Sequence, residues 1–162
     1  MHIRKATKED VPAILPIYND AILHTTATFD LKEKTLPEMQ QWFLKFNDTY
    51  PLIVAELDGK VVGYCSLSQF REKEGYKQTV EISVYVDKNA RGNGVASKLM
   101  HEIIELTKEA NHHVIMASIT KGNDVSVGLH ERFGFTYVGC LAQVGYKFGE
   151  WQDALYYQLI LS

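Results

Sequence analysis

Apolar residues recur along this chain with two spacings, and the spacing changes from one segment to the next. Alternation with a period of two predicts strands, and recurrence every three or four residues predicts helices. Strands are expected over residues 2–6, 52–57, 61–67, 79–86, 114–119, 135–139 and 154–161. Helices are expected around residues 10–22, 35–46, 99–110 and 125–133. This order of elements predicts one mixed α/β domain over residues 1–162.

Turn and cap residues mark the ends of several of these elements. Asp10 is expected to cap the first helix, because a side-chain oxygen at that position satisfies an unpaired amide of the first turn. The Thr-Leu-Pro-Glu sequence of residues 35–38 is a capping box. Asp58-Gly59 predicts a hairpin turn. Residues 145–153, rich in aromatic residues and glycine, are expected to connect the last two strands.

One stretch, residues 84–100, combines a strand end, a glycine-bearing turn and the start of a helix. The turn reads Arg-Gly-Asn-Gly-Val-Ala over residues 91–96. The first amides of a helix lack internal partners and lie at the positive end of the helix dipole, so such a turn favours anion binding. A connection that serves only the topology is the alternative.

Two well-known glycine motifs do not fit this turn. A Walker loop needs Gly-Lys-Ser or Gly-Lys-Thr after four spacers, and residues 95–97 are Val-Ala-Ser. A dinucleotide fold places its glycine turn after the first strand of the chain, not beyond residue 84. The turn therefore points to a different phosphate ligand.

Composition and charge exclude several classes of protein. A chain of 162 residues with 46% hydrophobic and 23% charged residues is typical of one globular domain. The net charge of −3 and the pI of about 6.1 give no reason to expect a nucleic-acid partner. The six histidines lack the spacing of zinc ligands, so no metal is expected. Cys65 and Cys140 lie in apolar segments, which predicts two buried thiols and no disulfide.

The N-terminal residues Met-His-Ile-Arg-Lys lack the apolar run of a signal peptide. No long apolar run occurs elsewhere, so no membrane contact is expected. The cytoplasm is the expected location.

The motifs together resemble those of the GCN5-related N-acetyltransferase (GNAT) superfamily. Residues 91–96 fit its pyrophosphate motif, Q/R-x-x-G-x-G/A. Its second motif is similar to the residues Asn123, Ser126, Leu129, His130, Gly134 and Phe135. The resemblance implies a twisted, mostly antiparallel sheet of about seven strands flanked by about four helices. It also implies acetyl-CoA as the donor and an amine as the acceptor.

A narrower resemblance is to the phosphinothricin and methionine sulfoximine acetyltransferases, in which a histidine replaces the usual tyrosine at position 130. It extends over residues 17–19, 26–29, 38–39, 42–43, 70–71, 75–76, 79–81, 83–86, 129–131, 147–148, 151 and 153. This subgroup implies a small amino-acid-like acceptor and a homodimer. Lys73 stands where many members have arginine.

Acetyl transfer by direct attack of an amine requires a base, and Glu81 is the first candidate. Alternation along residues 79–86 places Glu81 on one face with Thr79, Ser83 and Tyr85. That face is expected to line a cleft, where burial raises the pKa of a carboxylate. A solvated strand glutamate is the alternative.

His130 is a candidate second base, or the acid that protonates the departing thiolate, because its ordinary pKa is about 6.5. A packed helix histidine is the alternative there.

The resemblance assigns the remaining site residues to two ligands. Acetyl-CoA is expected to contact Val84, Val86, Arg91, Gly92, Asn93, Gly94, Val95, Ala96, Ser97, Asn123 and Ser126. The acceptor is expected to contact Phe29, Arg71, Lys73, Tyr76, Thr79, Tyr85 and Lys147. A solvated surface is the alternative for Arg71, Lys73 and Arg91, and a helix cap is the alternative for Asn123.

Three functions remain open at this level. The first is an N-acetyltransferase for methionine sulfoximine, methionine sulfone or phosphinothricin. The second is an acetyltransferase for another small amine or a protein N-terminus. The third is an acetyl-CoA-binding sensor without turnover, which the presence of both Glu81 and the residue 91–96 turn disfavours.

Overall fold

The computed structural model describes all 162 residues and contains one seven-stranded sheet with four α-helices. The strands lie in the order β1-β2-β3-β4-β5-β7-β6, and β4 with β5 is the single parallel pair. The strands are β1 (His2–Lys5), β2 (Leu52–Leu57), β3 (Lys60–Gln69), β4 (Thr79–Val86), β5 (Val114–Thr120), β6 (Thr136–Lys147) and β7 (Glu150–Ile160). The helices are α1 (Val11–His24), α2 (Leu36–Phe43), α3 (Val95–Glu109) and α4 (Asp124–Arg132). The expected fold class is confirmed.

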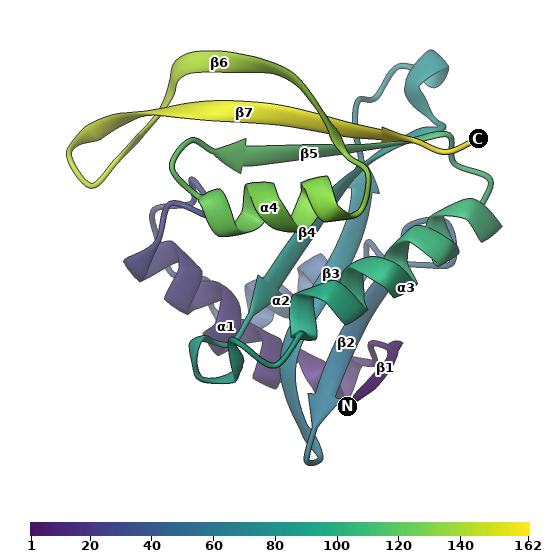
Figure 1. Cartoon of the computed structure of the whole chain (residues 1–162). Coiled ribbons are helices and arrows are strands. Elements are labelled where there is room, and N and C mark those ends of the chain that lie inside the picture. The colour runs from purple at the N-terminus through teal and green to yellow at the C-terminus, as the bar shows by residue number, and fades with distance from the viewer.

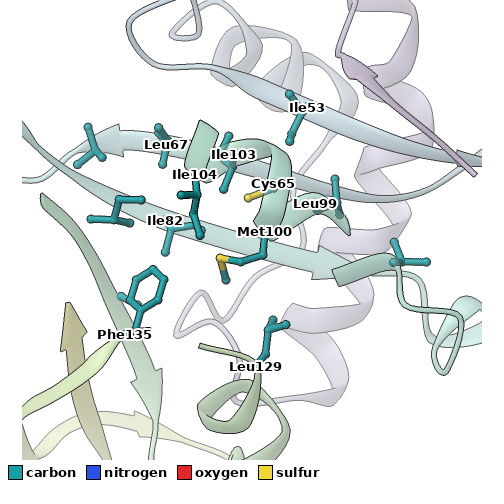
Figure 2. Close-up of a cluster of buried hydrophobic side chains, with 14 of the residues drawn as sticks. Ile53, Cys65, Leu67, Ile82, Leu99, Met100, Ile103, Ile104, Leu129 and Phe135 are labelled. Atoms are coloured by element: carbon teal, nitrogen blue, oxygen red, sulfur yellow. The ribbon is translucent and has the colours of Figure 1, made fainter. Parts of the chain in front are cut away.

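Helices cover both faces of the sheet, and each face has its own apolar core (Figure 1). The larger core lies under α3 and α4, where Leu99, Met100 and Ile103 meet strand residues such as Leu67 and Ile82 (Figure 2). The smaller core lies under α1 and α2 and includes Ile14, Met39 and Tyr64. Successive residues of a strand point to opposite faces, so the central strands supply both cores.

Gly63 on β3 allows α3 to approach the sheet closely. A Cβ at this position would lie 2.9 Å from Val95 and 3.3 Å from Leu99. Both of those side chains belong to the start of α3 and are buried. Close packing at Gly63 therefore fixes the N-terminus of α3 against the middle of the sheet.

Three expectations about element ends were wrong. Asp10 makes no side-chain bond to α1; its carboxylate instead pairs with Arg4 at 2.7 Å and accepts the Thr7 amide. A guanidinium is the stronger partner for a buried carboxylate than a cap amide. Helix α2 ends at Phe43 rather than near residue 46, and short turns follow it.

The third error concerns the last two strands, which are longer than expected. They continue through residues 145–153 into a hairpin that turns at Phe148 and Gly149, where φ is +54° and +74°. Two successive positive φ values suit a tight hairpin between twisted strands. The glycines of β6 lie at irregularities in its pairing with β7, and the strand continues past them.

The two cysteines differ in their surroundings. Cys65 is fully buried in the larger core, as expected. Cys140 is exposed on β6, so the expectation of a second buried thiol was wrong. Strand β6 lies at the edge of the sheet, and side chains on both of its faces are exposed around Cys140, including Val138 and Leu141. No helix is both long and apolar enough to span a membrane.

Candidate active site

The central feature of the site is the separation of β4 from β5. The two strands pair only through Thr79 with Val114, Val80 with Ile115 and Glu81 with Met116. Beyond Glu81, β4 continues beside β3, while β5 continues beside β7 (Figure 1). The edge of β4 over residues 82–86 therefore has no neighbouring strand on that side. The expected splay near residues 84–86 is present, and its free backbone groups suit an extended ligand.

Glu81 lies at the point where the strands separate. Its side chain is half-buried, and burial raises the pKa of its carboxyl. Across the sheet it is paired with Ser68 of β3. The next pairs on the same face are Ser83 with Ser66 and Tyr85 with Tyr64. Glu81 therefore begins a row of polar and aromatic side chains on the face covered by α1 and α2.

A cavity of about 600 Å³ opens on this face of the sheet. Ser66, Ser83, Tyr64 and Tyr85 line it from β3 and β4. The other walls come from α1, the α1–α2 loop, α2 and the turn that follows α2, and they supply Tyr18, Asp30, Lys34, Glu38, Met39, Gln41, Trp42 and Lys45. Ser83 is two residues from Glu81 along the strand, which is a rise of about 7 Å. The cavity thus lies next to the carboxylate and mixes aromatic rings with both signs of charge.

Hydrogen bonds inside this region hold the phenols in place. The Tyr18 hydroxyl donates to the Asp30 carboxylate and lies 3.0 Å from Thr28 Oγ1. Burial is the first cause that raises the pKa of Tyr18, and it also raises the pKa of Tyr85 to about 12. The Tyr18 and Tyr85 rings meet edge to face at 5.2 Å. Both hydroxyls therefore stay protonated at neutral pH and act as hydrogen-bonding groups rather than as charges.

The residues expected to bind the acceptor are distributed over three places. Tyr85 lines the cavity, and Thr79, the first residue of β4, is half-buried. Arg71, Lys73 and Tyr76 lie in the exposed β3–β4 loop. There the Arg71 guanidinium stacks 4.8 Å from the Phe70 ring centre and 5.5 Å from that of Tyr76. Aromatic stacking of this kind holds the guanidinium flat and leaves its edges free for an anion.

The other two expected acceptor residues join the α1–α2 loop to β6. Lys147 is buried, and its Nζ donates to the Thr28 carbonyl at 2.8 Å. Burial lowers the pKa of Lys147. The Phe29 ring packs on Gly145, where an added Cβ would lie 2.6 Å from the ring. Both side chains are therefore occupied with holding the loop.

The glycine turn before α3 has the geometry of an anion site. Gly92 and Gly94 have φ of +84° and +73°, which other residues adopt only at a cost, and no atom lies within 4 Å of a Cβ built on either. Gly94 is the residue before α3, whose first-turn amides, at residues 95–97, have no partner within the helix. Arg91 and Asn93 are exposed beside them. Open backbone and unpaired amides fit a diphosphate.

Asn123 caps α4. Its Oδ1 accepts the Ser126 amide at 3.2 Å, which is the bond expected of a helix N-cap. Both side chains are half-buried at the start of the helix. The Asn123 amide nitrogen is left to bind elsewhere, since the cap uses only the oxygen.

His130 is buried near the end of α4. Its Nδ1 lies 2.7 Å from the Ser126 carbonyl, and its ring meets Phe135 edge to face at 5.0 Å. A carbonyl only accepts, so Nδ1 carries the proton and Nε2 of the neutral ring has a free lone pair. Burial lowers the pKa of His130, which favours this neutral form.

Comparison with known proteins identifies the family. A family model described as an acetyltransferase (GNAT) domain matches residues 3–156. The chain belongs to the GNAT acetyltransferase family. This acetyltransferase is 43% identical to an L-methionine sulfoximine/L-methionine sulfone acetyltransferase of Pseudomonas paraeruginosa, over 99% of this chain and 94% of that one.

Two solved structures are also similar over nearly the whole chain. A ribosomal-protein-alanine N-acetyltransferase from Brucella melitensis is 46% identical with a TM-score of 0.97, and the match covers 99% of this chain and 100% of that one. A phosphinothricin acetyltransferase from Sinorhizobium meliloti, solved in complex with acetyl-CoA, is 30% identical with a TM-score of 0.95. That match covers 99% of this chain and 88% of that one.

These findings confirm the resemblance drawn from the sequence, including its narrower form. The protein is an acetyl-CoA-dependent N-acetyltransferase. The open turn at residues 92–94 and the separated strands after Glu81 fit the diphosphate and the extended arm of acetyl-CoA. No group of three or more His, Cys, Asp or Glu side chains is arranged to hold a metal ion.

Sequence reasoning did not assign the walls of the cavity beyond Tyr85. Tyr18, Asp30, Trp42, Tyr64, Ser66 and Ser83 come from four elements and the α1–α2 loop, and the fold brings them together. One signal was present, because Ser83 shares a strand face with Glu81 and Tyr85 by simple alternation. Tyr18 of α1 and Trp42 of α2 lie in segments of the narrower resemblance, but that resemblance gave them no role.

The turn before α3 can be tested with a matched pair of glycine substitutions. Gly94→Ala is expected to raise the KM for acetyl-CoA about tenfold, because a left-handed alanine costs about 1–2 kcal/mol and shifts the first-turn amides. Gly59→Ala is the control, since Gly59 has a similar φ of +76° and equally open surroundings in the β2–β3 turn. Steady-state kinetics measure both. An equal effect of the two variants on the KM for acetyl-CoA would contradict a role for this turn in binding.

Proposed function

We propose that the acceptor is the α-amine of a small amino-acid analogue of the methionine sulfoximine, methionine sulfone or phosphinothricin type. The neutral amine attacks the thioester carbonyl directly in a ternary complex, so that the C–N bond forms and the C–S bond breaks. CoA leaves as a thiolate and becomes the thiol by taking up the second proton that the amine nitrogen loses. The observation that carries the proposal is the position of Glu81, half-buried where β4 leaves β5 and on the same sheet face as the cavity. The names of the Pseudomonas relative and of the Sinorhizobium structure support this choice of acceptor.

Glu81 acts as the base in this proposal. An amino acid carries an ammonium at neutral pH, and only the neutral amine attacks a thioester carbonyl, which acetyl-CoA supplies. Glu81 takes the ammonium proton through a water molecule. The burial that raises its pKa brings its proton affinity closer to that of the amine, which favours the transfer. The raised pKa also means that Glu81 becomes protonated, and inactive as a base, at a higher pH than an exposed glutamate.

His130 serves as a second proton acceptor rather than as an acid. Its Nδ1 proton is committed to the Ser126 carbonyl, and burial lowers the pKa of the ring. A neutral ring has no second proton to give to a departing thiolate. The free Nε2 lone pair supports a role in accepting a hydrogen bond or a proton.

The acceptor's anionic end is held by the basic loop between β3 and β4. Arg71 is stacked on two aromatic rings with its guanidinium edges exposed, and Lys73 follows it in the same loop. This loop leads directly into Thr79, two residues before Glu81. A carboxylate or phosphinyl group bound there leaves the amine near the Glu81 carboxylate, with Tyr76, Tyr85 and Phe29 beside the side chain.

A homodimer in the cytoplasm completes the proposal. The β6–β7 hairpin exposes Tyr137, Leu141, Val144, Tyr146, Phe148 and Trp151. Trp151 is 64% exposed, and its ring lies 4.8 Å from that of Tyr146, which is itself exposed. Large apolar side chains gathered in the open mark an interaction surface. A second copy of the chain covering this hairpin would bury them, and the relatives' subgroup is expected to dimerise.

A protein N-terminus is the second candidate acceptor. It is supported by the name of the Brucella structure, a ribosomal-protein-alanine N-acetyltransferase at 46% identity. A folded protein presents its N-terminus on a flexible segment that needs an open groove. The cavity beside Glu81 is instead bounded by α1, α2 and the sheet, which favours a small molecule.

Thiol release from acetyl-CoA tests the acceptor class. The panel contains methionine sulfoximine, methionine sulfone, phosphinothricin, spermidine and a peptide with an N-terminal alanine. At least one of the first three acceptors is expected to release thiol. Its kcat/KM should be at least about tenfold higher than that of the peptide or of spermidine. Turnover of the peptide alone would overturn the proposed acceptor and support the second candidate.

Glu81→Gln tests the base. The loss of kcat/KM is expected to be about 100-fold or more near pH 6.5 and to shrink toward pH 9.5, where free amine is abundant without a base. Glu102→Gln, an exposed glutamate of α3, is the control and should follow the wild-type profile. A constant loss across the pH range would rule out proton abstraction by Glu81.

Trp151→Asp tests the dimer. In sedimentation velocity the wild type is expected to run as a dimer at micromolar concentration, and the variant as a monomer, because a buried unpaired carboxylate is costly. Val125→Asp is the control, since Val125 is 84% exposed on α4, away from the hairpin. A wild-type protein that remains monomeric at all concentrations would contradict the proposal.

A further inference from the structure

The loop between α1 and α2 connects the two halves of the separated sheet. It leaves α1, which packs beside β3 and β4, and its first part contacts β5 and β6. Beyond Glu81 the two halves share no strand pairing, since β4 and β5 no longer meet. Residues 25–30 of this loop therefore join parts of the sheet that hydrogen bonding between strands leaves apart.

Two buried side chains from the C-terminal half hold this loop by its backbone. Thr120, the last residue of β5, donates its hydroxyl to the Thr26 carbonyl at 2.6 Å. Lys147, the last residue of β6, donates its ammonium to the Thr28 carbonyl at 2.8 Å. Both donors are at most 7% exposed. Two carbonyls of half-buried loop residues, two positions apart, are thereby bonded to side chains rather than to a strand.

The same loop is tied to the N-terminal half through Tyr18. The Tyr18 hydroxyl contacts Thr28 Oγ1 and donates to the carboxylate of Asp30. Thr28 is thus held from one side through its side chain and from the other through its carbonyl. Asp30 and Tyr18 both line the cavity beside Glu81. The position of this cavity wall depends on bonds that originate in β5 and β6.

Lys147 has a different role here from that of an acceptor ligand. Its side chain is 3% exposed, and its ammonium is already bound to the loop carbonyl. Phe29 packs on Gly145, two residues before Lys147, so the contact between loop and strand is closed to solvent. An acceptor anion would have to displace this bond to reach the ammonium.

We propose that Thr120 and Lys147 are positioning residues for the acceptor, because they fix the residue 26–30 loop that carries the Asp30 wall of the cavity. This inference rests on the proposed function only in its kinetic consequence. The two hydrogen bonds also predict slow hydrogen exchange of the loop amides, and this prediction does not depend on the identity of the acceptor.

Thr120→Val and Lys147→Met remove each donor at nearly constant shape. Each is expected to raise the KM for methionine sulfone about tenfold while the KM for acetyl-CoA stays within about twofold. Thr120→Ser keeps the hydroxyl and should restore the acceptor KM. The double variant should be little worse than the worse single variant, because both donors hold one loop. Hydrogen exchange of the amides of residues 25–30 should be faster in both single variants.

Thr107→Val is the matched control. Thr107 is buried in α3 and donates its hydroxyl to the Ile103 carbonyl at 2.6 Å, the same bond in a place remote from the loop. This variant is expected to lower the melting temperature without changing either KM or the exchange of residues 25–30. Equal effects of Thr107→Val and Thr120→Val on the acceptor KM would show a general loss of stability and overturn the proposal.

The exchange measurement separates this inference from the proposed function. If methionine sulfone is not turned over but residues 25–30 exchange faster in Thr120→Val and Lys147→Met, the positioning role stands and the acceptor is wrong. Unchanged exchange in both variants would overturn the positioning role, whether or not methionine sulfone is acetylated.

Discussion

The site of this acetyltransferase depends on β4 having two different neighbours along its length. Up to Glu81 it pairs with β5, and beyond that residue it pairs only with β3. The break leaves backbone groups of residues 82–86 free on one edge. In a folded protein such groups need a partner, and an extended ligand arm can provide one. The same break gives Glu81 its half-buried position and its raised pKa.

The alternation of β4 divides the chemistry between the two faces of the sheet. Val80 and Ile82 belong to the larger core under α3 and α4, and they hold the helix whose N-terminus faces the glycine turn. Glu81, Ser83 and Tyr85 point to the other face, where α1 and α2 enclose the cavity. Donor and acceptor can therefore approach from different sides and meet at the opening between the strands. The α1–α2 loop, held by β5 and β6, joins the two halves again beyond that opening.

Much of this arrangement follows from local sequence. The period of apolar residues located all seven strands and all four α-helices, although it made the last two strands too short. The turn at residues 91–96 is open, as expected of a phosphate site. Alternation also placed Glu81 on the correct face. Local patterns failed where a distant partner decides the outcome. Asp10 pairs with Arg4 instead of capping a helix, and β6 continues through Gly145 because β7 supports it. The cavity walls and the Thr120 bond to Thr26 bring together residues far apart in sequence, so no local pattern predicts that they meet.

The central claim is that the opening between β4 and β5 receives the donor and presents it to an acceptor on the Glu81 face. The most direct test is a crystal structure with a bisubstrate analogue, in which the nitrogen of methionine sulfone is joined to the sulfur of CoA through an acetyl bridge. The pantetheine arm is expected to bond to the backbone of residues 84–86, and the diphosphate to the amides of residues 93–97. The amino-acid part should lie beside Glu81, on the face of Ser83 and Tyr85. An analogue bound outside the opening, or with its amino-acid part on the α3 face, would contradict the account.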